Sequence, residues 1–341
     1  MSNFSGGVKK TLSAACVIVG TVIGAGYISG REIVEFFLTG NLIVSVILSA
    51  CLFMPALYFL LTNELFKGGA LKKVSVYFIF VGNLVMLGGM LSAADEAASS
   101  VFVFLKKIPI VSVLTLIFCA FTVNKGIRGI EKVNNFLVPF TVVFTLVLLF
   151  FASGFTYIPT GKLKPLKIIS YTGLNLFMSS SVFKKTGETL TKKQAFIVSF
   201  LSTTILFGLV TLIGFSLDGD GKLKTSAVPL LEKLSFNGFS RYSFSLVLYF
   251  GIVTTLLSEN LAVFNFADLT IKSEKPRKIA KILICIAAFS LSKIGFYKIV
   301  EVLYPAVGVI GAIFVLIAVI FRLLSPKARP RDTLKPQARK V

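Results

Sequence analysis

The stretch from Cys16 to Phe37, CVIVGTVIGAGYISGREIVEFF, decides how this chain folds. It begins as an apolar helix and then carries Gly20, Gly24, Gly26 and Gly30 directly before a charged segment. Each glycine weakens a helix by about 1 kcal/mol relative to alanine. The sequence therefore predicts a helix that is interrupted in the middle of this stretch.

The length of the surrounding segment supports the same interpretation. As one helix, Thr11 to Thr39 would span about 43 Å at about 1.5 Å per residue, which exceeds a hydrocarbon core of about 30 Å. Broken backbone is tolerated at membrane depth only where it lines a cavity or is buried in protein. We therefore expect the helix to break near Ile23 to Tyr27, and we expect a binding site at the break.

The composition is that of a membrane protein. Of the 341 residues, 55% are hydrophobic and 15% are charged, and the mean hydropathy is +0.87. Soluble domains have about a quarter of their residues charged. Several apolar runs reach the roughly 18 residues that a membrane helix needs. The fold class predicted is an all-α polytopic membrane protein.

Enzyme and cofactor chemistry have little support in the sequence. There is no histidine, so the commonest proton shuttle and metal ligand is missing. The four cysteines, Cys16, Cys51, Cys119 and Cys285, lack metal or disulfide spacing. No nucleophile and base stand in a defensible arrangement. We predict that the chain is not an enzyme and has no cofactor apart from a coupling ion.

Ten spans fit the apolar runs best. They are predicted at residues 11–38, 41–66, 73–105, 108–124, 129–154, 168–188, 192–217, 238–271, 278–293 and 295–323. With this count, about two-thirds of the 36 basic residues lie on one side, which favours cytoplasmic positions for both termini. The net charge of +21 is then explained by membrane orientation, and no nucleic-acid partner is expected. Residues 325–341 are predicted to be a disordered basic tail facing lipid.

An internal repeat organises these spans. Residues 129–139, GIEKVNNFLVP, match residues 295–305, GFYKIVEVLYP, with Gly, Lys, Leu and Pro at the same spacing. We infer one transmembrane domain, 1–324, with a first repeat at 11–154 and a second at 168–323. Five spans per repeat would invert the second copy. Inverted repeats are typical of secondary transporters, which bind solute near the midplane between broken helices.

The inverted arrangement predicts a second broken helix at the start of the second half. Residues 170–181, SYTGLNLFMSSS, are rich in small and polar side chains for a membrane span. Glycine and asparagine are poor helix formers, which favours a break. The alternative is a continuous helix whose small residues pack closely against a neighbour.

Two short motifs resemble the LeuT-fold transporters of the amino acid–polyamine–organocation superfamily. The first is Gly20-x-x-Ile23-Gly24-x-Gly26, similar to the unwound segment of that family. The second is Gly251-Ile-Val-Thr254-Thr255, similar to the Thr-containing motif of its sodium-dependent members. The run Ser29-Gly30-Arg31-Glu32 more narrowly resembles the YkvI-like membrane proteins. The resemblance covers residues 11–323 and implies a bacterial plasma membrane as the location.

The resemblance implies a sodium site made by the carbonyls of Gly20, Ile23 and Gly251 and the hydroxyls of Thr254 and Thr255. The chemistry is consistent, because a hard cation prefers oxygen ligands and a broken helix frees carbonyls. The alternative for the two threonines is hydroxyls that bond back to their own helix.

The solute is expected next to this ion. Half-helix N-termini carry partial positive charge, so the amides near Ala25 and Gly26 would receive a carboxylate. The glycines at 88 and 89 either leave room for a ligand or let two helices approach. Loop 218–236 is predicted to contain a short helix, which is either a lid or a plain surface element. The predicted solute-binding residues are Gly24, Ala25, Gly26, Tyr27, Met86, Gly89, Asn175, Phe177, Ser179 and Asn260.

Four acidic residues are candidates for proton or charge sites, because ionisable groups inside a membrane are costly. They are Glu32, Asp95, Glu96 and Glu259. The alternatives are that Asp95 and Glu96 cap a helix in contact with water, and that Glu259 forms a structural pair. The predicted fifth span has no basic residue between Val133 and Gly154. By the resemblance, that absence favours sodium.

These observations predict a sodium-coupled importer of a small zwitterion such as an amino acid, working by alternating access. Its partners would be the small solute, Na⁺ or H⁺, and the lipid bilayer. The first alternative is a proton-coupled carrier that uses Glu32 or Glu259. The second is a non-transporting regulatory protein of the same fold, whose basic tail binds a partner.

Overall fold

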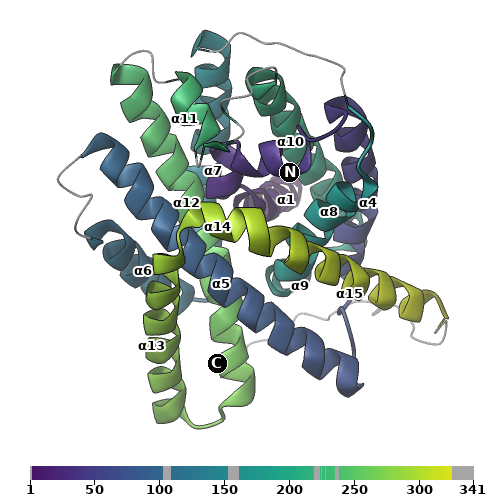
Figure 1. The fold of residues 1–341 in the computed structure, drawn as a ribbon. Coiled ribbons are helices and arrows are strands. Elements are labelled where there is room, and N and C mark those ends of the chain that lie inside the picture. The colour runs from purple at the N-terminus through teal and green to yellow at the C-terminus, as the bar shows by residue number, and fades with distance from the viewer. Residues whose placement is uncertain are drawn as a thin grey trace.

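A computed structural model describes residues 2–102, 109–152, 161–218, 223, 225–226, 228–234 and 238–324. All secondary-structure elements assigned among these residues are helices (Figure 1). The predicted tail, 325–341, lies outside the described residues. The helices are α1 Ser2–Val22, α2 Ala25–Ile28, α3 Arg31–Phe36, α4 Leu42–Thr62, α5 Gly69–Val101, α6 Ile110–Val123, α7 Ile127–Ala152, α8 Pro165–Met178, α9 Ser180–Gly187, α10 Lys192–Leu217, α11 Pro229–Leu234, α12 Gly238–Thr270, α13 Glu274–Leu291, η3 Ser292–Ile294, α14 Phe296–Lys298, the π-helix η4 Ile299–Leu303 and α15 Tyr304–Leu324.

Six stretches of the described chain are helical, long and apolar enough to cross a membrane. They belong to α4, α5, α7, α10, α12 and the continuous run from α14 to α15. Large apolar side chains such as Phe121, Phe136 and Phe150 are exposed on the outside, as expected of a surface that faces lipid. The protein is therefore an integral membrane protein. Helices also occupy most of the described residues in the predicted span ranges.

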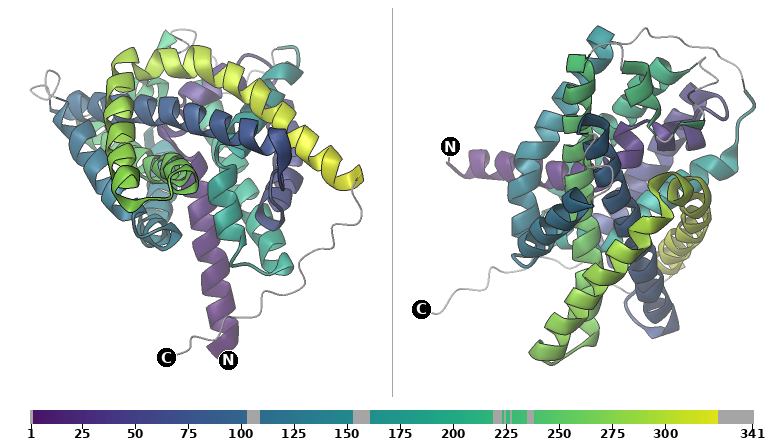
Figure 2. Two further views of the ribbon diagram at one scale, coloured as in Figure 1. Left: turned by 90° about the horizontal axis from the view of Figure 1, so that it is seen from below. Right: turned by 60° about the vertical axis from the view of Figure 1, so that its left-hand side comes forward.

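Two helices form the interior. In α12, 83% of the most apolar stretch is buried, against 28–50% in the other five membrane-length helices. The buried part of α1 lies among α7, α10 and α12, near the centre of the view (Figure 1). The first turns of α1 extend beyond the other helices (Figure 2). The site described below lies where α1 meets α12.

The first helix is interrupted at Ile23 and Gly24, which belong to neither α1 nor α2. Gly24 is extended, with φ −101° and ψ −167°, and its amide donates to the Val22 carbonyl at 2.9 Å. The carbonyl of Gly20 is thereby left out of the helical hydrogen-bond ladder. Gly30, with φ 81°, makes the left-handed turn into α3 that a residue with a side chain would rarely adopt.

The corresponding interruption in the second half is smaller. Only Ser179 separates α8 from α9, and it stays near helical geometry with φ −85° and ψ −1°. Its amide still donates to the Asn175 carbonyl at 3.3 Å. Close packing explains part of the predicted small-residue pattern, because a Cβ on Gly173 would overlap the backbone of Gly308 in α15. Segment 170–181 therefore combines a small interruption at Ser179 with the close helix packing that was the alternative.

Candidate ion and solute site

The threonine pair of α12 faces the break in α1. The Thr255 hydroxyl donates to the Gly20 carbonyl at 3.2 Å. The Thr254 hydroxyl donates to the carbonyls of Gly251 at 2.8 Å and Ile23 at 3.5 Å. Both threonines are buried. Three of the oxygens predicted to hold sodium thus meet at Thr254 and the other two at Thr255. Carbonyl and hydroxyl oxygens are the ligands that a hard cation prefers.

Glycines make this approach of the two helices possible. A Cβ on Gly251 would overlap Ile28 and lie 3.3 Å from the Ile23 carbonyl oxygen. A Cβ on Gly24 would lie 3.1 Å from the Thr255 hydroxyl and 2.9 Å from the Met90 methyl group. Side chains at these positions would separate α12 from the break. The spacing of the two glycine motifs therefore has a steric reason.

The two threonines differ in how they bond. Thr254 bonds both to its own helix, at Gly251, and across to Ile23, with the shorter distance inside the helix. For Thr255 the described bond crosses to α1. The Thr254 hydroxyl therefore bonds back to its own helix, which was the alternative expected for the pair. The Thr255 hydroxyl bonds to the Gly20 carbonyl, which the break in α1 leaves free of a helical bond.

Asn134 of α7 is a neighbour of this site that the sequence analysis did not single out. Its side chain is fully buried, and neither amide atom has a hydrogen-bond partner in the described part of the chain. A Cβ on Gly20 would lie 2.6 Å from its Nδ2. The side-chain amide of Asn134 is thus a further polar group beside Gly20, with Nδ2 as its nearest atom.

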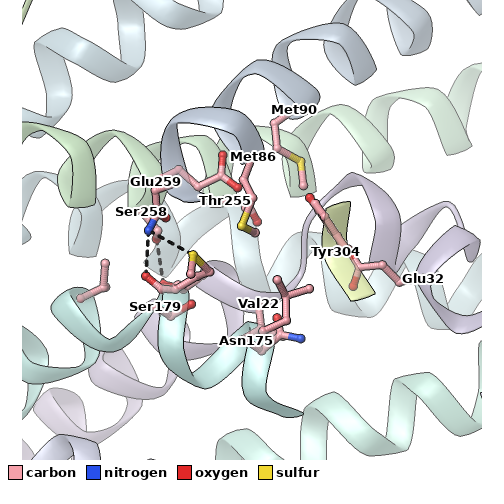
Figure 3. A pocket seen from close by; sticks show the side chains of 15 residues that line it. Val22, Glu32, Met86, Met90, Asn175, Ser179, Thr255, Ser258, Glu259 and Tyr304 are labelled. Carbon is pink, nitrogen blue, oxygen red and sulfur yellow. Dashed lines mark hydrogen bonds between the residues drawn. The ribbon is translucent and has the colours of Figure 1, made fainter. Parts of the chain in front are cut away.

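A cavity with about 420 Å³ of space not filled by atoms lies next to the break (Figure 3). Six predicted site residues line it, three of them from the solute set, two from the acidic set and one from the ion set. Its lining comprises Thr21, Val22, Glu32, Asn83, Met86, Met90, Leu174, Asn175, Met178, Ser179, Val182, Thr255, Ser258, Glu259 and Tyr304. Helices α1, α3, α5, α8, α9, α12 and α15 all contribute, so the cavity lies between the two halves of the chain.

Several predicted solute-binding residues do not line the cavity. Phe177 stacks on Phe314 of α15, with ring centroids 4.9 Å apart and planes 8° apart. Gly89 packs against Ile299, so the glycines of α5 serve helix packing. The Tyr27 hydroxyl donates to the Leu206 carbonyl of α10. Each of these side chains contacts a neighbouring helix because it lies on another face of its own helix.

The residues around α2 lie beside the cavity without forming its wall. Gly24 and Ala25 are buried at the break, and Asn260 is buried with no hydrogen-bond partner for its amide in the described chain. At Gly26, where a cargo carboxylate was expected, a Cβ would overlap the Glu32 carboxyl group. The carboxyl of the protein itself therefore occupies the space over Gly26.

The remaining acidic candidates have structural contacts. Asp95 accepts a hydrogen bond of 2.9 Å from the Ser112 amide near the start of α6. Glu96 accepts one of 3.4 Å from the Ser92 hydroxyl. Neither carboxyl lines the cavity. Asp95 in particular satisfies an amide of the first helical turn, in the manner of a capping residue.

A set of contacts around α3 lies next to the cavity-lining Glu32. The Arg31 guanidinium lies 4.3 Å from the centre of the Tyr297 ring and 3.7 Å from the Glu35 carboxylate. The short helix α11 packs onto the same region, because the Leu230 amide donates to the Ser29 carbonyl at 2.8 Å. The predicted outer helix therefore contacts the turn between α2 and α3, next to the cavity.

Comparison with known proteins places this architecture. No protein-family model matches the chain. The chain is 26% identical to the uncharacterized membrane protein YkvI of Bacillus subtilis, covering 94% of this chain and 97% of YkvI. It is 23% identical to the uncharacterized protein YyaD of the same organism, covering 91% and 96%.

Two solved structures share the fold over most of their length. MhsT, solved in complex with L-phenylalanine, superposes with a TM-score of 0.65 at 14% identity, covering 89% of this chain and 87% of MhsT. A manganese transporter of Eremococcus coleocola superposes with a TM-score of 0.56 at 15% identity, covering 94% and 78%. The expectation of a transporter fold rather than an enzyme agrees with these likenesses. This chain is therefore an integral membrane protein with the LeuT-type transporter fold, and it is similar to the membrane protein YkvI.

Proposed function

We propose that the protein is a sodium-coupled secondary transporter of a small organic solute bearing an amino group, with amino acids as the class expected from sequence. The observation that supports it best is the meeting of Thr254 and Thr255 with the carbonyls of Gly20, Ile23 and Gly251 at a helix break. This cluster adjoins the cavity, because Thr255 also lines its wall. In this proposal the chain has ten spans in two inverted sets of five.

Sodium would couple to transport by joining the two halves of the site. Its ligands come from α1, which carries the break, and from α12, which packs in the interior. An ion held between them stabilises the conformation in which the two helices are in contact. Thr255 belongs to both the ion cluster and the cavity wall, so a bound ion also fixes one side of the solute site.

Alternating access would then move α1, α4, α8, α9 and α10 against the remaining helices, as in other transporters built from inverted repeats. The likeness to MhsT, whose structure contains L-phenylalanine, agrees with a small solute. At 14% identity it supports the fold and does not identify the solute. The choice of solute therefore rests on the cavity of this chain.

A proton-coupled carrier is the second candidate, and one observation favours it. The carboxyl groups of Glu32 and Glu259 line the same cavity and are only 4% and 3% exposed. Buried carboxyl groups exchange a proton when their surroundings change, and proton relays in membrane carriers are built from such groups.

The test is thermal unfolding of the purified full-length protein in NaCl and in KCl of equal ionic strength. A ligand present at 100 times its Kd stabilises the folded state by about 2.7 kcal/mol. We expect NaCl to raise the Tm, and we expect the double variant Thr254→Val, Thr255→Val to lose that increase. Thr204→Val is the matched control, because the Thr204 hydroxyl is exposed and bonds to Phe200 in its own helix.

Uptake into vesicles separates the two candidates. Solute uptake driven by an inward sodium gradient supports sodium coupling. A protein whose Tm is the same in both salts, and whose uptake follows a pH gradient instead, contradicts the sodium proposal and supports the second candidate. A protein that takes up no solute under either gradient contradicts both.

A further inference from the structure

The charged side chains around the cavity are all of one sign. Glu32 and Glu259 line it, and none of its lining residues is Lys or Arg. The nearest basic residue in sequence, Arg31, has its guanidinium over the Tyr297 ring and beside Glu35. Among the described residues, the cavity wall therefore has two carboxyl groups and no cationic side chain.

Of these two carboxyl groups, that of Glu259 lacks a hydrogen-bond partner among the described residues. It is 3% exposed, and neither carboxyl oxygen has a hydrogen-bond partner among the residues described. The adjacent hydroxyl of Ser258 is engaged elsewhere, with Thr21 at 2.7 Å and the Thr254 carbonyl at 3.4 Å. A buried carboxylate without a partner is strongly unfavourable. A cation or a hydrogen-bond donor in the cavity would remove that cost.

Glu32 excludes a second negative charge from the place where a cargo carboxylate was expected. Its carboxyl group packs against Gly26 of α2. A solute carboxylate in this cavity would lie among the buried groups Glu32 and Glu259, where like charges repel strongly. A zwitterion would satisfy Glu259 with its ammonium group but would bring its carboxylate into the same cavity as Glu32.

The rest of the wall suits the carbon chain of the solute. Met86, Met90 and Met178 provide flexible, polarisable surface, as methionine does at adaptable binding sites. Figure 3 shows Met86, Thr255 and Glu259 around the same space, with Ser179 and Asn175 on the facing helix. A divalent metal ion would need about six oxygen ligands drawn tightly around it. The methionines and other apolar side chains of this wall suit the carbon atoms of an organic molecule better.

We propose that the cargo is an organic amine of net positive charge that lacks a carboxylate, with its ammonium group bound by Glu259. This inference rests on the proposed transport function and narrows its solute class. The ammonium N–H groups donate to the two unpartnered oxygens of Glu259, and the aliphatic chain lies along the methionines. Glu32 adds to the negative potential of the cavity and rejects anionic solutes.

The experiment compares solutes that share a four-carbon chain and carry ammonium groups, a carboxylate, or both. Butylamine, butane-1,4-diamine, 4-aminobutanoate and butanoate are titrated into the purified full-length protein at fixed NaCl and ionic strength, with Tm as the readout. We expect the two amines to raise the Tm and the zwitterion and anion to leave it unchanged. Glu259→Gln should weaken amine binding at least tenfold. Glu274→Gln, whose carboxylate is exposed and paired with Lys278, should not weaken it.

Three results overturn the proposal. One is stabilisation by 4-aminobutanoate or butanoate but by neither amine. Another is stabilisation by MnCl₂ at micromolar concentration without any effect of amines. The third is unchanged amine binding in both Glu259→Gln and Glu259→Asp, where a folded size-exclusion profile shows that the variants are intact.

The sodium response separates this proposal from the proposed function. If sodium raises the Tm and no amine does, the solute class is wrong and the transport proposal stands. If amines bind through Glu259 while sodium affects neither the Tm nor uptake, sodium coupling is wrong and the solute class stands.

Discussion

The hydroxyl of Thr255 donates a hydrogen bond of 3.2 Å to the carbonyl of Gly20, joining two residues that are 235 positions apart in the chain. The Gly20 carbonyl is available because the Gly24 amide turns to Val22 instead. A side chain of α12 therefore satisfies a backbone group that the break in α1 releases. The break and the threonine pair form one local structure, and each is expected to depend on the other.

Thr255→Val tests that dependence. Valine keeps the shape of the side chain but leaves the buried Gly20 carbonyl without its donor, which costs about 1–3 kcal/mol. We expect a lower Tm in KCl and a loss of the sodium-induced increase. Thr255→Ser retains the hydroxyl and should keep most of both. Equal Tm values for the valine variant and the wild type in both salts would show that the bond has no role.

Asn134→Leu should have opposite effects in the two salts. The Asn134 amide is buried without a described partner, so leucine removes an unsatisfied polar group. Replacing such a group by an apolar one of similar size is neutral or stabilising. In KCl we therefore expect an unchanged or higher Tm. In NaCl we expect a smaller sodium-induced increase, because a polar amide beside Gly20 is lost.

The matched control for this variant is Asn135→Leu, since the neighbouring Asn135 is exposed on the other side of α7. It should change neither the Tm in KCl nor the sodium response. If Asn134→Leu lowers the Tm in KCl and leaves the sodium increase intact, Asn134 is a packing residue and not part of the ion site.

Features of the site that depend on the backbone could be predicted from sequence. Features that depend on which side of a helix a residue faces could not. The break was predicted near Ile23 to Tyr27, and the helix is absent at Ile23 and Gly24. Glycine density and excess length both act on the backbone, and both can be read from sequence. The meeting of Thr254 and Thr255 with this segment was expected from the resemblance of both motifs to the LeuT-fold transporters.

The residues that were misplaced or missed share a different cause. Gly89 and Phe177 lie in the expected helices but face Ile299 and Phe314 instead of the cavity. A glycine that makes room for a ligand and one that makes room for a helix look identical in sequence. Asn134 was overlooked because a single amide in an apolar span has no signal until its neighbour, Gly20, is known.

Gly173→Ala should destabilise the protein through the packing of α8 on α15. A Cβ at this position would overlap the Gly308 carbonyl and the Ala312 amide, which are backbone atoms that cannot rotate away. Overpacking of this kind costs about 1–3 kcal/mol. The expected result is a lower Tm in either salt, measured by thermal unfolding of the purified variant.

Gly208→Ala is the opposite case on α10. No atom lies within 4 Å of a Cβ built on Gly208, so the added methyl group meets open space. Alanine is the better helix former by about 1 kcal/mol. We expect the Tm to stay or to rise. A drop of equal size in both alanine variants would show that helix packing is not what distinguishes the two glycines.

Tyr297→Ala should increase access to the cavity, because Arg31 stacks on Tyr297 next to the cavity-lining Glu32. The buried guanidinium stacks 4.3 Å from the ring centre, and a cation–π contact of this kind contributes about 0.5–2 kcal/mol. Its loss should raise the population of the open state by roughly twofold to thirtyfold. Ser179 lines the cavity, so Ser179→Cys in a background with the four native cysteines replaced by alanine reports access to a thiol reagent. We expect faster labelling with Tyr297→Ala.

Tyr297→Phe is the control, because it keeps the ring and loses only the hydroxyl bond of 3.1 Å to Glu301. Its labelling rate should match that of the protein with Tyr297. Equal acceleration by both variants would assign the closure to that hydroxyl bond and not to the stacking of Arg31.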